Sequence, residues 1–510
     1  MLTLLVLVFA WRILFSHHFN LIPDECSYWA WSRRLDWSYF DNSGMTAYLV
    51  RLSTAILGEH TPFSVRLPFL ILSAASTWLV YSISLLLFGS THRALLSALI
   101  LNLTPLGLLG AAAAMHDNAL MFFQLCALWA AARFLRSEDQ RWFYVMGASA
   151  GASILSKYTG VLVLPCLLLF LLLSPSHRRL VLQPGPWIGA LIAGTFMLPI
   201  IGWNIAHHWA SLNHVLFIGT GSLDWTRRLA DGLGYHAAQF IIISPFFYLA
   251  LTAGLWRACK RNPAHPDPGE ILLLVFSFPL LFFGVLAFKG HVEANWASMG
   301  YPSAIILAVE MICRADADKK SAFPRFLDPR FRRWALILAV GPVVLTVLHA
   351  WIGLLPAALE KKLEKVDRIV WETRGWDGLG RHVRAVTKNG DVIAGDSYQI
   401  CALLEFNVPG NPYVRYLAPW KRPTQFDVWE PSFDNLAGRN ILFVSPQPLA
   451  PSSESRASIY ENFERVEELP GYGVEYHGNV IRTIHIYRGW NFNPFAPKRL
   501  GPRSLKYTRE

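Results

Sequence analysis

The amino-acid sequence predicts a mostly α-helical, polytopic membrane protein with a small α/β domain at its C-terminal end. Of the 510 residues, 53% are hydrophobic and 16% are charged, whereas a soluble protein of this length is about a quarter charged. Apolar runs long enough to cross a bilayer, which takes about 20 residues, recur through residues 1–356. After residue 357 the composition changes, and charged residues and turn-forming residues become frequent.

The apolar runs are the first elements to assign. We expect about 11–13 membrane-spanning helices, with boundaries good to a few residues. No small-x-small cleavage site follows the first run, so we interpret it as a span and not as a signal sequence. A tight turn is expected at Lys157, Tyr158 and Gly160, between two short runs. The predicted spans are residues 2–18, 62–88, 94–114, 118–135, 142–156, 159–174, 186–206, 235–256, 270–288, 296–313 and 334–356.

The short loops between these runs differ in charge. If the N-terminus is cytoplasmic, the loops on the inner side hold most of the basic residues, as the positive-inside rule requires. The net charge of +11 then serves as a topology signal, and no nucleic-acid partner is expected. The long first loop, residues 19–61, and the whole tail lie on the outer side. The inner basic residues are Arg93, Arg133, Arg136, Arg141, Arg178, Arg179, Arg257, Lys260 and Arg261, with the basic stretch 314–333.

The tail is expected to form a soluble α/β domain over residues 357–510, beside a transmembrane catalytic domain over residues 1–356. Three short β-rich runs occur there, at residues 391–394, 440–444 and 483–487. The six cysteines form no CxxC or zinc pattern, so a disulfide framework is not expected.

Polar clusters that are hard to explain structurally all fall on the outer side. The first loop is acidic and aromatic, and the spacing of Tyr28, Trp31 and Leu35 suits an amphipathic helix at the membrane interface. Ionisable groups at membrane depth are costly and usually functional, so we expect one cavity that opens outward. The clusters are Asp24-Glu25, His116-Asp117-Asn118, Lys157-Tyr158 and the segment from Lys289 to Trp296.

Each cluster also has a simpler structural explanation. Asp24 and Asp117 could only cap helices, because acidic residues are common in the first helical turn. Lys157 could be a snorkelling lysine at the end of a span. Single histidines near a membrane are more often interfacial than metal ligands. Only the segment 289–296 is denser in polar residues than a plain loop requires.

The motifs resemble those of the aminoarabinose-transferase-like glycosyltransferases, which have a GT-C fold, use polyprenyl-phosphate sugars and are related to protein O-mannosyltransferases. Pro23-Asp24-Glu25 with Tyr28-Trp29, followed by Asp36-Trp37-Ser-Tyr39-Phe40-Asp41, is similar to the first outer loop of that family. The His116 turn, the Lys157 turn and Lys289-Gly-His291-Val-Glu293-Ala-Asn295-Trp296 have counterparts in the same order. The tail has weaker counterparts at residues 397–399 and 425–429.

The resemblance implies a role for each of these residues. Asp24 falls at the position of the catalytic base, and Asp117 would support the acceptor or the base. Candidates for holding the lipid phosphate are Arg33, Arg34, Tyr39, Lys157 and Lys289. Substrate would be bound by Glu25, Tyr28, His291, Glu293, Asn295 and Trp296. Asp41, with His214 from the 207–236 loop, would hold a divalent metal, although two ligands are too few to name it.

Two departures from the family pattern limit what the resemblance implies. After Tyr39-Phe40 the chain reads Asp41-Asn42-Ser43-Gly44, where the family often has a run with a basic residue that holds phosphate. Ala294 stands where the family usually has proline. The sugar can therefore differ from that of the family's aminoarabinose enzymes.

The predicted enzyme moves a sugar from a polyprenyl phosphate to lipid A or a lipopolysaccharide core, with inversion at the sugar carbon. The expected setting is a bacterial inner membrane, with the site facing the periplasm and the protein a monomer among membrane lipids. No G-x-G-x-x-G or Walker pattern suggests a nucleotide cofactor. Two alternatives remain: an enzyme with a protein acceptor, similar to protein O-mannosyltransferases, and a transporter of lipid-linked sugars. Transporters usually place charges at the midplane of paired halves, and here the charges collect on one side.

Overall fold

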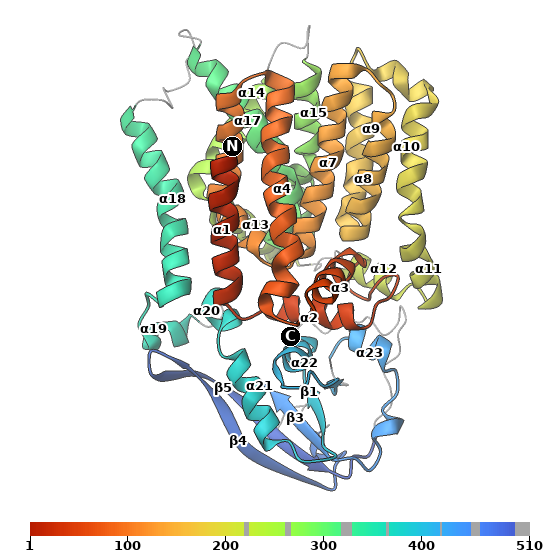
Figure 1. Cartoon of the computed structure of the whole chain (residues 1–510), viewed down its shortest axis with the longest axis vertical. Helices are drawn as coiled ribbons and strands as arrows, with labels where there is room; N and C mark the ends of the chain where they lie inside the picture. The colour runs from red at the N-terminus through yellow and green to blue at the C-terminus, as the bar shows by residue number, and fades with distance from the viewer. Residues whose placement is uncertain are drawn as a thin grey trace.

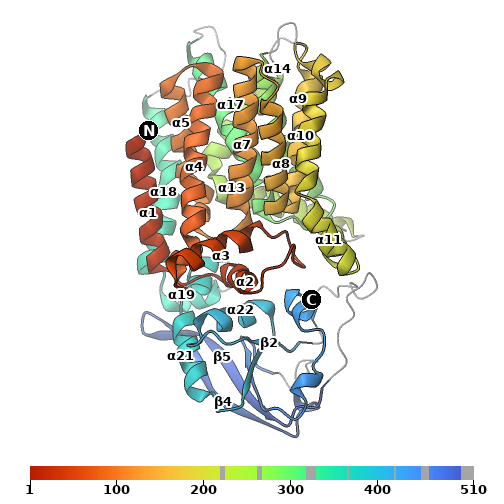
Figure 2. The same ribbon diagram turned by 45° about the vertical axis from the view of Figure 1, so that its right-hand side comes forward.

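The computed structural model describes residues 1–218, 224–260, 267–317, 329–363, 367–418, 421–449 and 459–494. It has two parts, a bundle of long helices and a smaller domain that closes one end of the bundle with a sheet (Figure 1). We call that end of the bundle the domain-facing end. The connections α4–α5, α7–α8 and α9–α10 lie at the opposite end in Figures 1 and 2.

The helical part is built from apolar helices of unequal length. Its α-helices are α1 (Leu2–His18), α2 (Pro23–Arg33), α3 (Met45–Leu57), α4 (Pro62–Phe88), α5 (Thr91–Leu103), α6 (Pro105–Leu108), α7 (His116–Ser137), α8 (Trp142–Ser156), α9 (Val163–Leu173), α10 (Pro184–Thr195), α11 (Leu198–Ala206), α12 (Ala210–Ile218), α13 (Trp225–Ile243), α14 (Pro245–Lys260), α15 (Pro268–Phe276), α16 (Phe278–Leu286), α17 (Tyr301–Ala317) and α18 (Pro329–Ile352). The 3₁₀ turns are η1 (Gly110–Ala112), η2 (Tyr158–Leu162), η3 (Arg178–Leu182) and η4 (Ala294–Gly300).

Five of the helices within the described residues are long and apolar enough to cross a membrane, and three bent helix pairs could raise that number to eight. Shorter apolar helices occur at Met45–Leu57, Tyr158–Leu173 and Val340–Ile352. The polytopic helical architecture is therefore confirmed. The number of about 11–13 spans stays a prediction.

Two predicted spans are bent rather than straight. The run predicted at 94–114 ends as a helix at Leu103, and the chain turns by 82° before it continues. Pro105 explains the break, since proline disfavours helical backbone at the residue before it. The run predicted at 235–256 divides at Ser244, between α13 and α14. Ser244 has a positive φ of 79°, and Pro245 begins the next helix.

The first loop folds into two short helices that lie across the domain-facing end of the bundle (Figure 2). The α1–α2 pair is bent by 86°. Pro23 occupies the first turn of α2, and the Glu25 carboxylate accepts the N–H of Ile22 at 3.0 Å, which completes the N-terminus of the helix. A helix forms where one was predicted, although it ends at Arg33, before Leu35, and its position at a membrane interface stays a prediction. The helix α3, which follows in the same loop, was not predicted.

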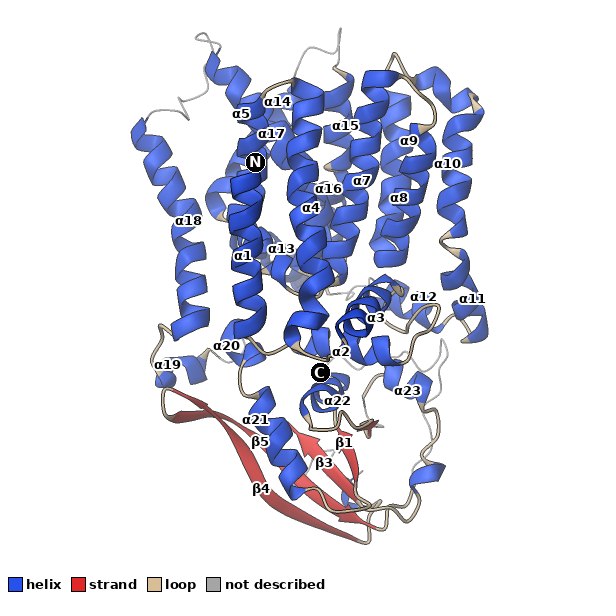
Figure 3. Ribbon diagram, in the orientation of Figure 1, coloured by secondary structure: helices blue, strands red, loops and turns tan. Residues whose placement is uncertain are grey.

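The C-terminal domain contains a five-stranded mixed sheet in the order β2-β1-β3-β5-β4 (Figure 3). The predicted strands are confirmed as β1, β3 and β5. The prediction missed β4, which contains Pro470, two glycines and register shifts, all of which weaken a strand signal. The strands are β1 (Val392–Gly395), β2 (Arg415–Tyr416), β3 (Ile441–Ser445), β4 (Arg465–Tyr476) and β5 (Asn479–Trp490). The helices are α19 (Ala357–Lys362), α20 (Arg368–Thr373), α21 (Trp376–Val386), α22 (Tyr398–Asn407) and α23 (Gln425–Trp429), with the turn η5 (Asp434–Leu436).

The domain shares a hydrophobic core with the first loop. Cys26 and Trp29 of α2 lie in one buried cluster with Ile400 and Leu404 of α22 and with Ile486 of β5. Burial of this apolar surface fixes the domain against the end of the bundle. The exact division at residues 356 and 357 remains a prediction.

Candidate active site

A cavity of about 950 Å³ lies between the domain-facing end of the bundle and the C-terminal domain. It is lined by residues of α1, α2, α4 and α7, by the turns at Lys157 and Asn295, and by Tyr398 and Arg422 of the C-terminal domain. This volume is within the range of cavities that hold small molecules or lipid headgroups. The cavity collects most of the polar clusters that the sequence analysis placed on one side.

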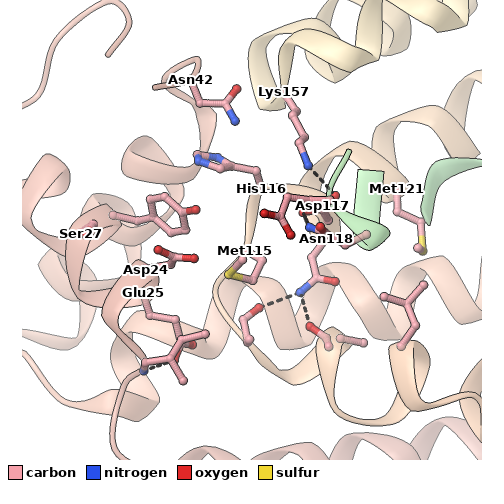
Figure 4. A pocket seen from close by; sticks show the side chains of 18 of the residues that line it. Asp24, Glu25, Ser27, Asn42, Met115, His116, Asp117, Asn118, Met121 and Lys157 are labelled. Carbon is pink, nitrogen blue, oxygen red and sulfur yellow. Dashed lines mark hydrogen bonds and ion pairs between the residues drawn. The ribbon is translucent and has the colours of Figure 1, made fainter. Parts of the chain in front are cut away.

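Asp24 comes from the first turn of α2 and lines the cavity, half-buried. In Figure 4 its carboxylate points into the cavity, toward the side from which His116 and Asp117 approach. The N-terminus of a helix favours a negative charge, which suits an ionised carboxylate there. One turn further along, the Tyr28 ring packs on the His116 ring at 4.2 Å between centroids. Thr46 holds His116 in place through a 2.6 Å hydrogen bond to Nδ1.

Asp117, at the start of α7, is held by three donors. Lys157 Nζ pairs with its Oδ1 at 2.8 Å, as Figure 4 shows, and Asn295 Nδ2 donates to Oδ2 at 2.9 Å. Ser298 Oγ adds a longer hydrogen bond of 3.3 Å to Oδ1. Asp117 and Lys157 are both buried, at 8% exposure, and both line the cavity. The structure thus joins three motifs that lie up to 178 residues apart.

Asp41 and His214 also lie together, as the sequence analysis expected, but an arginine joins them. Asp41 Oδ1 is 3.1 Å from His214 Nε2 and 2.9 Å from Arg422 Nη1. Burial alone would raise the pKa of Asp41, but Arg422 and His214 hold it well below its ordinary value. The Arg422 guanidinium occupies the position beside Asp41 that a divalent cation would take. It also already supplies positive charge to the Asp41 carboxylate. This residue set therefore does not fit a metal site.

Arg422 was not predicted, and neither was Tyr398, which also lines the cavity. Burial raises the pKa of the Tyr398 phenol, and the nearby carboxylates of Asp24 and Asp41 raise it further, so it remains a hydrogen-bond donor. Only the family-like tail segments 397–399 and 425–429 hinted at these positions. Arg422 lies 381 residues from Asp41 in the sequence, and no local pattern can reveal such a pair.

Glu25, predicted to bind substrate, is instead engaged within the protein. It is fully buried, and its oxygens accept Arg66 Nε at 2.8 Å, Arg66 Nη2 at 2.6 Å and the Ala114 N–H at 2.7 Å. With the bond from Ile22, its acceptor capacity is filled. This geometry favours a structural role, in which Glu25 holds α2 against α4 and the start of α7.

Arg33, Arg34 and Tyr39, predicted to hold the lipid phosphate, lie outside the residues that line the cavity. Arg34 Nη2 and Arg33 Nη1 pair with the fully buried Glu405 at 2.6 and 3.4 Å. The Tyr39 hydroxyl donates to the Trp31 carbonyl at 3.1 Å, and its ring stacks on Trp31. These contacts favour a role in the junction or the loop for all three side chains, and the geometry does not support the predicted contact with a phosphate in this cavity.

The segment 289–296 contributes only its second half to the cavity. Glu293, Asn295 and Trp296 line it. Lys289 is exposed beyond the end of α16, and His291 is 58% exposed, paired with Glu293 at 3.0 Å. The structure therefore does not place Lys289 or His291 at the cavity wall.

A different cluster has the composition of a metal site. His349, Glu360 and Asp367 bring three potential ligand atoms within 4.8 Å of one another, the one such group in the part of the chain that the structure describes. His349 Nδ1 accepts the N–H of Leu354 at 3.0 Å, so Nε2 carries the proton and donates to Asp367. A metal on Nε2 would displace that proton, and none of the three residues lines the cavity.

Comparison with known proteins agrees with this architecture. A family model described as dolichyl-phosphate-mannose-protein mannosyltransferase matches residues 41–203. The chain is 28% identical over 313 residues to the lipid A galacturonosyltransferase RgtD of Rhizobium johnstonii, which covers 61% of this chain and 65% of that protein. It is 27% identical over 364 residues to the undecaprenyl phosphate-alpha-4-amino-4-deoxy-L-arabinose arabinosyl transferase of Pectobacterium atrosepticum, which covers 65% of this chain and 61% of the relative. The matched region spans less than two thirds of either relative.

A solved structure extends the likeness in fold to most of the chain. The crystal structure of ArnT from Cupriavidus metallidurans bound to undecaprenyl phosphate superposes with a TM-score of 0.61 at 16% identity, over 95% of this chain and 97% of that one. At this identity the likeness concerns the fold. The GT-C-type fold and the resemblance to aminoarabinose-transferase-like glycosyltransferases are confirmed.

Proposed function

From the fold of this chain and its similarity to a lipid A galacturonosyltransferase and to arabinosyl transferases, we propose a membrane glycosyltransferase that moves a sugar from a polyprenyl phosphate to a lipid acceptor. The observation that carries this proposal is the pair of carboxylates in one cavity. Asp24 and Asp117 come from different helices, and both line the same space at the domain-facing end of the bundle. A structural capping role for either residue would not require a shared cavity.

The two carboxylates have different surroundings and so take different roles. Asp117 is held by Lys157, Asn295 and Ser298, which fixes its position and neutralises its charge. Asp24 is half-buried at a helix N-terminus, and its carboxylate points into the cavity (Figure 4). Asp24 is therefore the base, and Asp117 is a positioning residue that holds Lys157 toward the donor phosphate and Asn295 toward the acceptor.

The donor phosphate needs positive charge, and the C-terminal domain supplies it. The first loop lacks the basic residue that the family often has after Tyr39-Phe40. Arg422 reaches the same loop from the domain, contacts Asp41 at 2.9 Å and lines the cavity. Together with Lys157 and the Tyr398 hydroxyl, it can bind the phosphate and stabilise the charge that develops when that phosphate leaves.

The reaction is a single displacement. Asp24 takes the proton of an acceptor hydroxyl, and the oxygen attacks the anomeric carbon of the sugar. The bond from that carbon to the phosphate oxygen breaks, and the polyprenyl phosphate leaves with the electron pair. The proton on Asp24 then passes to solvent. One displacement inverts the configuration at the sugar carbon, and no step requires a nucleotide or a metal.

Lipid A is the acceptor that we favour, because two curated relatives are named for modifying lipid A or for transferring aminoarabinose from undecaprenyl phosphate. The protein would then act as a monomer in a bacterial inner membrane with the cavity toward the periplasm. A protein acceptor is the second candidate, since the matching family model is described as a protein mannosyltransferase.

The test is transfer by the purified protein in liposomes. Asp24→Asn should abolish transfer from an undecaprenyl-phosphate sugar to lipid A, while the protein still inserts and binds the donor. Asp377→Asn, at an exposed carboxylate of α21, is the matched control and should keep wild-type activity. Galacturonate and aminoarabinose donors, each offered with lipid A and with a Ser/Thr-rich peptide, identify the sugar and the acceptor. Full activity of Asp24→Asn would refute the assignment.

A further inference from the structure

Arg12 is a charged residue in the middle of an apolar helix. It lies on α1, whose other residues up to Ser16 are uncharged, and only 2% of its surface is exposed. It precedes the end of α1 at His18 by six residues, or about 9 Å along the helix axis. An ionisable group at membrane depth is costly to bury, so its retention needs a reason.

Only some of the N–H groups of the Arg12 guanidinium have a hydrogen-bond acceptor in the protein. Nη2 donates to Asn102 Oδ1 and to the Gly107 carbonyl, both at 2.9 Å. Nε and Nη1 are buried without a hydrogen-bond partner, which leaves three N–H groups unused. No carboxylate lies within ion-pair distance of Arg12 in the ranges that the structure describes. A buried charge paired only with neutral groups lacks a counter-ion.

Asn102 and Gly107 hold the Arg12 side chain in place. Asn102 donates to Thr77 Oγ1 at 3.1 Å and to the Ala98 carbonyl at 2.8 Å, so its own oxygen is turned toward Arg12. Gly107 lies in α6, just after the bend that separates it from α5, and a Cβ atom there would come within 1.8 Å of the Leu101 carbonyl oxygen. Only glycine fits this turn, and the turn presents the carbonyl that Arg12 binds.

Arg12 borders the same cavity as Asp24, but from a different side. The cavity lining also includes Ser73, Ser76 and Thr77 of α4. Their hydroxyls now donate to carbonyls of their own helix, at 2.9 to 3.0 Å, and can rotate toward an anion. Asp24 lies beyond the 86° bend between α1 and α2. The cavity lining therefore includes a second group of polar side chains, one arginine and three hydroxyls, on α1 and α4 of the helical bundle.

We propose that Arg12, with the hydroxyls of α4, forms a second anion subsite that binds a phosphate group of a lipid substrate at membrane depth. The phosphate supplies the missing counter-ion and accepts from the unused N–H groups, which arginine does better than lysine. The proposal that the phosphate belongs to a substrate rests on the function proposed above. The subsite orients a lipid along α1 while its reacting end lies near Asp24.

The experiment measures binding by the full-length protein in detergent, with four lipids and one ion. The lipids are undecaprenyl phosphate and undecaprenol, and lipid A with and without its phosphates; the ion is inorganic phosphate. Arg12→Gln should weaken binding of one phosphorylated lipid by at least about tenfold and leave its dephosphorylated partner unchanged. Arg12→Lys should recover part of the loss. The lipid affected shows whether donor or acceptor occupies the subsite, and an effect on inorganic phosphate alone would refute a lipid ligand.

A second variant covers the case in which Arg12→Gln does not fold. Asn102→Asp keeps the size of the side chain and gives Arg12 an internal carboxylate. It should preserve folding and weaken the same phosphorylated lipid. Equal weakening of phosphorylated and dephosphorylated lipids, or no weakening in either variant, would overturn the proposal and leave Arg12 a structural residue. A wild-type protein that transfers no sugar would refute the proposed function, while these binding measurements would still decide the subsite.

Discussion

Two sets of arginines cross the junction between the helical bundle and the C-terminal domain in opposite directions. Arg33 and Arg34 extend from the end of α2 to the domain, where both pair with the buried Glu405. Arg422 extends from the domain to the first loop, contacts Asp41 and lines the cavity. The pair in the recognisable motif therefore stabilises the junction, while the arginine without a motif faces the proposed substrate.

Whether one of these arginines can bind a ligand depends on how deeply its carboxylate partner is buried. Glu405 is fully buried and held between two arginines, so neither guanidinium is available to a ligand at the cavity. Asp41 is half-buried, shares its charge with His214, and lies at the cavity wall. A phosphate could compete with Asp41 for Arg422 far more readily than with Glu405 for Arg34.

Replacing Arg422 should give the largest effect. Arg422→Gln removes the positive charge proposed to stabilise the leaving phosphate, and we expect kcat/KM to fall by about 10²-fold. Transfer from a polyprenyl-phosphate sugar in liposomes measures this. Arg33→Gln, at an arginine outside the cavity lining, serves as the matched comparison and should change kcat/KM only a few-fold. If the two variants lose equal activity, the distinction between the two sets fails.

Replacing Glu405 should have an intermediate effect, on stability more than on catalysis. Glu405→Gln leaves two arginines facing a neutral amide at the junction, which we expect to cost about 2 kcal/mol. Thermal unfolding in detergent, with proteolysis of the C-terminal domain as a second readout, measures this loss. Asp377→Asn on the exposed face of α21 should leave both readouts unchanged. Unaltered unfolding of Glu405→Gln would contradict the stabilising role of the α2–α22 contact.

Removing metal ions should have the smallest effect. Arg422 stands beside Asp41 and His214, so we expect chelators to leave transfer unchanged, because the loop has no need of a cation there. Activity with and without a strong chelator, repeated for Asp41→Asn, measures this. A chelator-sensitive activity that zinc or manganese restores would show that Arg422 moves away to admit a metal.

Part of the site was predictable because its members lie in local motifs that the hydropathy and charge pattern places at one end of the helical bundle. Asp24, Asp117, Lys157 and Asn295 were named from the sequence, and the structure brings them to one cavity. Arg422 was not predicted, because the sequence motifs in the C-terminal tail are weak. Tyr39 and Lys289 were assigned by their place in motifs, and whether a side chain faces the cavity depends on packing that motifs do not encode.

The sequence by itself determined the class of this protein: an apolar helical bundle, a separate sheet-containing tail, and polar clusters gathered at one end. Hydropathy and charge determine these features because the preference of each side chain for water or for lipid is a property of that residue and can be read from the sequence. Only the tertiary structure decided which charges neutralise one another, since those pairs join positions up to 381 residues apart. It paired Glu25 with Arg66 and Arg34 with Glu405, and among the described residues it gave Arg12 no counter-ion. Ion pairing depends on distances of a few ångströms, which only the folded chain defines.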